Sequence, residues 1–387
     1  MNTQAEPLLL HAHRQGGQLT RMEISNQRPR AAALLTGRSP DEAAVLVPRL
    51  FALCAQAQQS AARLACAAAM GQPALSEGEA AALERRLAAE AAQEHLWRLL
   101  LDWPPLLGFD ARRNRYAELH RRLSRQLSAE DAYALGGDLL DLVARELLAG
   151  FFTRLREPRN LGEFVDRAEA GGGLGSVLGA LVRFGTAGAP ASGALPLLPR
   201  RSAAGWLDVL GGLPGEDWCL QPTDHGAAAE TGPLARNAES PLVRLLLEQG
   251  HRISARLLAK VIDVADCASR LRQPLAAEVP VLADAASPAP GVGLAWVETA
   301  RGLLLHGVRL DGEGRIADYR VCAPTEWNFH PAGSFASEGS GWPAPDGEIA
   351  QKRLHALALA LDPCVAYRVI LDDADPMEEP AAGAGHA

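Results

Sequence analysis

The spacing of apolar residues predicts helices over most of the first 275 residues. Ser39 and Glu42 flank a proline in a capping-box pattern, and apolar residues then recur at helical spacing. Ser76 and Glu79 repeat this pattern before a long stretch rich in Ala, Leu, Arg and Glu. Helical patterns then alternate with loops, so we expect a helical region at residues 20–275.

The pattern changes after a Pro/Ala-rich segment, residues 278–293, which has the composition of a boundary between two regions. Two strand-like runs follow, "GLLLHGVRL" at 302–310 and "RIADYRVCA" at 315–323. The "DGEG" between them favours a tight hairpin. A last helix is predicted to start near Asp346 and to end at Leu361, so the hairpin is followed by a helix.

These elements together predict an α+β protein that is mostly helical. Residues 292–371 are expected to hold the β-hairpin and the last helix, and we assign residues 1–371 to one large domain. Residues 372–387 are acidic and rich in Pro, Ala and Gly, which is typical of a disordered tail.

Composition argues against several classes of protein. The chain has 38 basic and 46 acidic residues, a net charge of −8, so neither nucleic acid nor an anionic membrane is an expected partner. No run approaches the ~18 apolar residues of a membrane span, and the first residues lack a signal-peptide pattern. We therefore expect a cytoplasmic protein without membrane insertion. No GxSxG motif supports a hydrolase.

Six cysteines are scattered along the chain without a CxxC pair. In a reducing compartment they should be thiols, and a lone cysteine is most often a small buried apolar residue. From chemistry alone, neither Cys54 nor Cys364 is favoured as a metal ligand. Their sequence neighbourhoods change that interpretation.

Six short segments resemble, in the same order, motifs of the large subunit of nickel-iron hydrogenases. They are "RMEI" at 21–24, "TGRSPDEA" at 36–43, "ETGPLAR" at 230–236, "ETARG" at 298–302, "APTEWN" at 323–328 and "DPCVAY" at 362–367. The resemblance covers nearly the whole chain. It implies a large-subunit-like fold with a small β-hairpin or sheet region in the C-terminal third.

In that family, two CxxC motifs supply four thiolates to a nickel-iron centre whose iron carries cyanide and carbon monoxide. In "RLFALCAQAQ", Arg49 is kept, Cys54 matches the second cysteine, and Phe51 replaces the first. In "DPCVAYRVI", Cys364 matches the first cysteine and Tyr367 replaces the second. The resemblance thus implies that Cys54 and Cys364 each remain from a metal-binding pair, one from a bridging and one from a nickel-only position.

The resemblance also implies which residues surround the metal. Arg301 matches an arginine that lies beside the diatomic ligands, where a guanidinium can donate to a cyanide nitrogen. Glu23 matches a glutamate near the proton path of the family. Pro324 and Thr325 belong to the "APT" block, and Arg49 precedes the first cysteine motif.

Two thiolates out of four do not sustain a stable nickel-iron centre, so hydrogen cleavage is not expected. The family's two motif histidines are replaced by Gln58 and Ile370, and Ile370 implies neither a magnesium site nor proteolytic removal of the tail. The pattern resembles hydrogenase accessory proteins of the HupK/HoxV type. It implies a non-catalytic scaffold that transiently holds the iron-cyanide-carbonyl fragment at Cys54 and Cys364, with the hydrogenase large subunit and small maturation chaperones as partners.

Alternatives remain open at this point. Cys322, next to the "APT" block, is a further candidate ligand, although a role in the core of a strand is favoured. The chain could also be a metal-free docking factor for hydrogenase assembly, or a divergent hydrogenase or redox subunit. Iron retention in cysteine variants distinguishes the scaffold from the metal-free docking factor. Hydrogen turnover by the purified protein tests the divergent hydrogenase or redox subunit.

Overall fold

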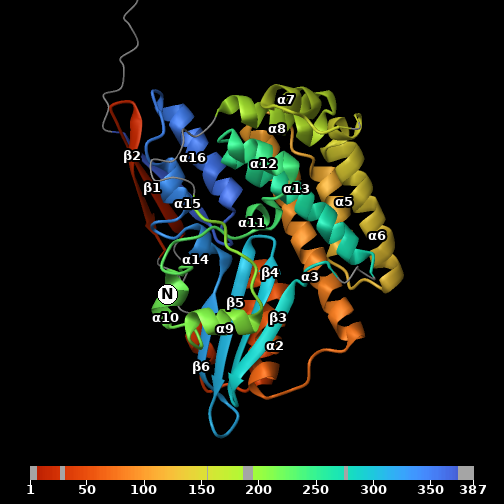
Figure 1. The fold of residues 1–387 in the computed structure, drawn as a ribbon, viewed down its shortest axis with the longest axis vertical. Coiled ribbons are helices and arrows are strands. Elements are labelled where there is room, and N and C mark those ends of the chain that lie inside the picture. The colour runs from red at the N-terminus through yellow and green to blue at the C-terminus, as the bar shows by residue number, and fades with distance from the viewer. Residues whose placement is uncertain (1–6, 27–30, 155, 186–194, 274–277, 374–387) are drawn as a thin grey trace, which may run out of the picture.

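The computed structural model describes residues 7–26, 31–154, 156–185, 195–273 and 278–373, in which a mostly helical body carries two small sheets (Figure 1). The α+β, mostly helical class expected from the sequence is confirmed. The longer helices of the body are α3 (Glu77–Trp97), α5 (Arg113–Leu123), α6 (Ala129–Leu142), α7 (Leu161–Ala170), α8 (Gly173–Phe184), α12 (Pro241–Glu248), α13 (Arg252–Leu271) and α16 (Gly347–Leu361).

Helix α13 is the centre of the helical body and packs against α3 and α6 (Figure 1). Sixteen of its twenty residues are buried, including Arg252 and four further charged side chains, all five neutralised by ion pairs. The other four are Arg256, Lys260, Asp263 and Arg270. A central helix with charges inside the core needs partners from several other elements, so α13 fixes those elements relative to one another.

A four-stranded antiparallel sheet forms the second layer, in the order β3 (Ala283–Ala289), β4 (Val292–Thr299), β5 (Gly302–Leu310) and β6 (Ile316–Cys322). The hairpin expected at "DGEG" is confirmed as the β5–β6 connection. Helix α1 (Pro40–Leu50) precedes α2 (Ala55–Ala69), and α2 packs across β4 and β5. Both expected capping boxes are present, Ser39 with Glu42 on α1 and Ser76 with Glu79 on α3.

The shorter helices connect these parts. They are α4 (Trp103–Leu106), α9 (Ala203–Leu210), α10 (Glu216–Leu220), α11 (Pro233–Asn237), α14 (Pro324–Asn328) and α15 (Ser334–Gly339). Within the described ranges, none of the helices has the length and apolarity needed to cross a membrane.

The expectation of helix from residue 20 onward is wrong at its start, because the chain opens with two strands. β1 (Leu8–Gln15) and β2 (Gln18–Ser25) form an antiparallel hairpin closed by two glycines with φ of +62° and +70°. The residues of β1 alternate between buried and partly exposed, as a half-buried strand requires. The "RMEI" segment therefore lies on a strand.

Two further features predicted from composition differ in detail in the structure. The Pro/Ala-rich segment 278–293 contains β3, an edge strand whose register shifts beside Pro288, where a proline is tolerated. The tail expected from residue 372 begins later, because Asp372 and Asp373 belong to β7 (Tyr367–Asp373). The rest of the expected tail, 374–387, lies outside the described residues.

Strand β7 brings the end of the described chain back to its beginning. It pairs in parallel with β1, and the three-stranded sheet has the order β2-β1-β7. Arg14 of β1 donates to Asp373 of β7 at 2.7 Å, which closes the far end of the pairing. One apolar core includes Leu8, near the start, and Val369, near the end.

Candidate functional site

Cys54 lies at the N-terminal end of α2, where a helix has backbone N–H groups without intrahelical partners. Glu90 of α3 accepts two of them, from Gln56 at 2.8 Å and from Ala57 at 2.9 Å. Burial raises the pKa of Glu90 to about 7, although these two N–H groups oppose the shift. A side chain from a neighbouring helix thus caps α2 and fixes where Cys54 stands.

Cys364 follows directly after the end of α16. The helix stops at Leu361, and Asp362 adopts a left-handed backbone conformation with a φ of +54° before Pro363 turns the chain. Thr325 then holds the cysteine by two contacts. Its Oγ1 accepts the Cys364 backbone N–H at 3.1 Å and lies 2.9 Å from the Cys364 sulfur.

The structure brings these two cysteines to one cavity of about 500 Å³. Apolar side chains make up much of its wall, among them Leu50, Phe51, Leu53, Leu220, Val321 and Val365. The pKa of Cys54 is raised to about 12, chiefly by burial and also by the charges of Cys364 and Glu90, while Arg301 and Gln58 oppose the shift. The two sulfurs therefore lie within electrostatic range of each other, and a metal must displace the Cys54 proton in order to bind there.

Arg301 lies in the turn between β4 and β5, only 3% exposed. Its Nη2 donates to Glu94 at 2.8 Å and its Nε to Asp362 at 3.3 Å, while Nη1 takes part in neither contact. Burial opposes the positive charge, but Asp362, Glu94 and Cys364 outweigh burial and raise the pKa of Arg301. The guanidinium is thus a fixed cation beside both cysteines.

Asp362, two residues before Cys364, was not singled out from the sequence, although it holds this region together. Besides Arg301, its carboxylate accepts from Arg98 at 2.7 Å and from Lys260 at 2.9 Å. Burial alone would raise the pKa of Asp362, but these three cations hold it well below its usual range. A signal was present in the sequence: Lys260 is one of only two lysines, and it falls on an apolar stretch of helix.

Other residues singled out from the sequence are distributed differently. Pro324 is buried at the start of the short helix α14 that carries Thr325. Glu23 is exposed on β2, where it pairs with Arg21 and His13, and Arg49 is exposed at the end of α1. Neither lines the cavity that holds the cysteines. The expectation that both surround the site is therefore corrected, because β2 and the last turn of α1 direct these side chains to the surface.

Cys322 is fully buried at the end of β6, among the tryptophans of a separate apolar cluster, and does not line the cavity. Its favoured role in the strand core agrees with this position. Cys219 does line the cavity, and no sequence signal distinguished it. Across the described ranges, His, Cys, Asp and Glu side chains form no group of three or more arranged to hold a metal. A soft metal bound by Cys54 and Cys364 would need most of its other ligands from outside the protein.

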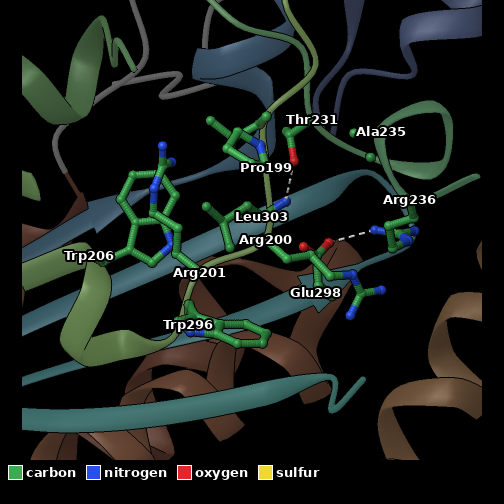
Figure 2. Close-up of a pocket in the computed structure, with 12 residues that line it drawn as sticks. Pro199, Arg200, Arg201, Trp206, Thr231, Ala235, Arg236, Trp296, Glu298 and Leu303 are labelled. Atoms are coloured by element: carbon green, nitrogen blue, oxygen red, sulfur yellow. Dashed lines mark hydrogen bonds and ion pairs between the residues drawn. The ribbon is translucent and has the colours of Figure 1, made fainter. Parts of the chain in front are cut away.

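A second pocket lies against β4 and β5 and is lined by Arg200, Arg201, Trp206 and Trp296 (Figure 2). Arg236 of the "ETGPLAR" segment donates to Glu298 there at 2.6 Å, and this contact is drawn as a dashed line in Figure 2. The cavity measures about 20 Å³, which is room for about one water molecule. Its charged groups therefore support the fold, and no ligand site is assigned to it.

No protein-family model matches the chain. Among curated proteins, it is 33% identical over 365 residues to the hydrogenase expression/formation protein HoxV of Cupriavidus necator, covering 89% of this chain and 92% of that protein. It is 31% identical over 378 residues to the hydrogenase expression/formation protein HupK of Rhizobium leguminosarum bv. viciae, covering 91% and 92%.

Two solved hydrogenase structures share the overall fold of this chain. The Ni-Fe-Se hydrogenase from D. vulgaris Hildenborough matches with a TM-score of 0.60 and 18% identity, covering 90% of this chain and 94% of that chain. An NAD+-reducing [NiFe]-hydrogenase matches with a TM-score of 0.59 and 17% identity, covering 90% and 93%. At this identity the likeness establishes the fold alone.

Proposed function

The chain belongs to the HoxV/HupK family of hydrogenase expression/formation proteins, and from that premise we propose that it is a non-catalytic scaffold in nickel-iron hydrogenase maturation. Its cargo is the iron-cyanide-carbonyl fragment, held at Cys54 and Cys364 until transfer to the hydrogenase large subunit. The observation that carries this proposal is the meeting of these two thiols, from opposite ends of the chain, at one cavity beside a buried arginine.

The donor set suits this cargo. Thiolates are soft ligands for iron, and iron that already carries strong diatomic ligands needs few further donors from the protein. Two sulfurs supply those donors, at a cavity whose wall is largely apolar. Phe51 lines this cavity at the position where the resemblance implies a cysteine in hydrogenases.

Arg301 supplies recognition of the diatomic ligands. Its Nε and Nη2 are held by Asp362 and Glu94, so the plane of the guanidinium is fixed. Nη1 can then donate to a cyanide nitrogen, a charge-assisted hydrogen bond that neutral carbon monoxide accepts less well. The same positive charge offsets the two thiolates that iron binding creates.

Thiolate exchange to a recipient protein requires access from outside, and the cavity provides it. Leu53 and Leu220 line the cavity and are 41% and 43% exposed. Apolar side chains at an opening favour contact with another protein, in our proposal the hydrogenase large subunit or a small maturation chaperone. The same observation supports a second candidate function, a docking factor for hydrogenase assembly that holds no metal.

Infrared spectroscopy tests the proposal on protein purified anaerobically from a host that expresses the hydrogenase maturation genes. We expect cyanide and carbon monoxide bands in the parent protein and their loss in Cys54→Ala and Cys364→Ala. Cys66→Ala is the matched control, because Cys66 is buried on the same helix α2 but does not line the cavity. Bands and iron content that persist in both cavity variants would refute the iron-binding role.

A maturation assay in the host separates the two candidate functions. The scaffold predicts that the double variant Cys54→Ala/Cys364→Ala fails to support hydrogenase activity. A docking factor without metal predicts full activity of that variant.

A further inference from the structure

A buried line of polar side chains leads from the sheet to Cys54. Tyr319 of β6 lies 2.7 Å from His306 of β5, between the hydroxyl oxygen and Nδ1. The other ring nitrogen, Nε2, lies 2.9 Å from Oε1 of Gln58 on α2. The Gln58 Nε2 in turn donates to the Cys54 sulfur at 3.6 Å, one helical turn away.

These three side chains are buried in a region of apolar packing. His306 is 0% exposed, and Gln58 and Tyr319 are each 2% exposed. An apolar side chain at any of these positions would need no hydrogen-bond partner. A buried imidazole, amide or phenol is destabilising unless its polar atoms are hydrogen-bonded. The three side chains are hydrogen-bonded to one another in series. The amide NH₂ group of Gln58, at the end of the series, donates to the Cys54 sulfur.

The direction of the chain follows from the chemistry of its members. Burial lowers the pKa of His306 to about 3, so the imidazole is neutral and has one donor and one acceptor nitrogen. Because the Gln58 Oε1 can only accept, Nε2 of His306 is the donor and Nδ1 accepts the Tyr319 hydroxyl. Each bond in this direction leaves the Gln58 N–H group facing the sulfur.

We infer that Tyr319, His306 and Gln58 are positioning residues that hold an N–H donor on the Cys54 sulfur and so reduce its electron donation when it acts as a ligand. A hydrogen bond from an amide stabilises negative charge on sulfur and withdraws electron density from a bound metal. The two ligand sulfurs consequently differ: Cys54 receives an amide from the core, and Cys364 lies beside the Thr325 hydroxyl. The difference between the two sulfurs does not depend on the proposed function, whereas its effect on bound iron does.

The first test uses the protein without iron. Alkylation by iodoacetamide, followed by mass spectrometry of each cysteine peptide, measures how much reactive thiolate each cysteine presents at one fixed pH. Gln58→Leu is expected to slow alkylation of Cys54 by about three- to tenfold, the equivalent of one hydrogen bond. Tyr319→Phe weakens that bond only through His306, so it should slow alkylation by a smaller factor. Cys364 in the same sample is the internal reference and should keep its rate.

Gln59→Leu is the matched control, because Gln59 is the same residue type on the same helix but donates to the Ala44 carbonyl. It should leave the Cys54 rate unchanged. Tyr319→Phe is the more informative variant, since its hydroxyl is three hydrogen bonds from the sulfur and its removal changes no group that touches the sulfur.

The second test is the infrared spectrum of the iron-loaded protein. Loss of the N–H donor in Gln58→Leu makes the sulfur a stronger electron donor, so the carbon monoxide band should move to lower wavenumber without disappearing. Tyr319→Phe keeps that donor but weakens its orientation, so its band should move in the same direction by a smaller amount. A Cys54 alkylation rate that stays at the parent value in both variants overturns the inference, whatever the spectra show. If alkylation of Cys54 is slowed in the variants but the parent protein shows no cyanide or carbon monoxide bands, the inference stands and the iron cargo is rejected.

Discussion

Replacement of Asp362 by asparagine removes the one carboxylate that Arg98, Lys260 and Arg301 share. The side chain of Asp362 is 1% exposed, and its contacts with Arg98 and Lys260 are both shorter than 3 Å. An asparagine of the same shape offers one acceptor and turns an NH₂ group toward a buried cation. Three cations then remain near the cysteines, with Glu94 as a partner of Arg301.

The expected loss of unfolding free energy follows from these contacts. Each hydrogen bond to a charged group contributes about 1.5–3 kcal/mol, and breaking a buried ion pair on one side costs about 3–5 kcal/mol. We therefore expect Asp362→Asn to lose about 3–5 kcal/mol at pH 7, measured by urea denaturation followed by circular dichroism. The exposed pair of Asp141 with Arg145 on α6 provides the control, since Asp141→Asn should lose less than about 0.5 kcal/mol.

The dependence on pH gives an independent check. Because the pKa of Asp362 is depressed in the folded protein, its stabilisation is present above the unfolded value of about 3.9 and is lost as the pH falls below it. The gap between parent and variant should thus shrink in acid. A loss below about 1 kcal/mol at pH 7 would refute the reasoning. If the variant does not fold, adding Lys260→Met should recover folded protein, because it removes one stranded cation.

Three further outcomes are expected. Thr325→Val should lower iron retention and cost about 1–2 kcal/mol, because two contacts to Cys364 disappear; iron content and urea midpoints check this, with Thr325→Ser near the parent. Glu90 has a raised pKa of about 7, so the folded state holds its proton more tightly than the unfolded state. The free energy of unfolding should therefore fall by up to about 3 kcal/mol between pH 4.5 and 7. Urea midpoints of Glu90→Gln should lack this dependence on pH, and the same dependence in parent and variant would contradict the assignment. Gly293→Ala places a Cβ 2.1 Å from the Ala65 carbonyl oxygen of α2, so it should lower the thermal midpoint by several degrees, whereas Gly312→Ala, in open space, should not.

The sequence predicted those elements whose signals are local. Ser39 and Ser76 start their helices as expected, and the β5–β6 hairpin is where its turn residues indicate. The first hairpin was missed because β1 begins with three consecutive leucines, Leu8 to Leu10, so the alternation of apolar and polar residues covers only its second half. The β3 strand was missed because a sequence of alanine, serine and proline has little β-propensity and relies on pairing with β4.

The site shows a similar division. Cys54, Cys364, Arg301 and Thr325 were all named from short motifs, and the structure gathers them around one cavity or its immediate neighbours. The supporting residues come from elsewhere in the chain. Glu90 acts across 34 residues, and Gln58 is linked to His306 across 248. Contacts of that separation depend on how helices and sheet pack, and no local pattern encodes them.

The parallel pairing of β7 with β1 joins the two ends of the described chain, so this part of the fold forms late in synthesis. Cys364 follows Cys54 by 310 residues, so at roughly 5–20 residues per second the ribosome adds it about 15–60 s after the first cysteine. Until then, Cys54 has neither its companion thiol nor Asp362 to anchor Arg301. If the proposed scaffold holds its cargo with both thiols, a chain synthesised only as far as α13 offers one sulfur ligand and no anchored Arg301, and it is not expected to retain iron.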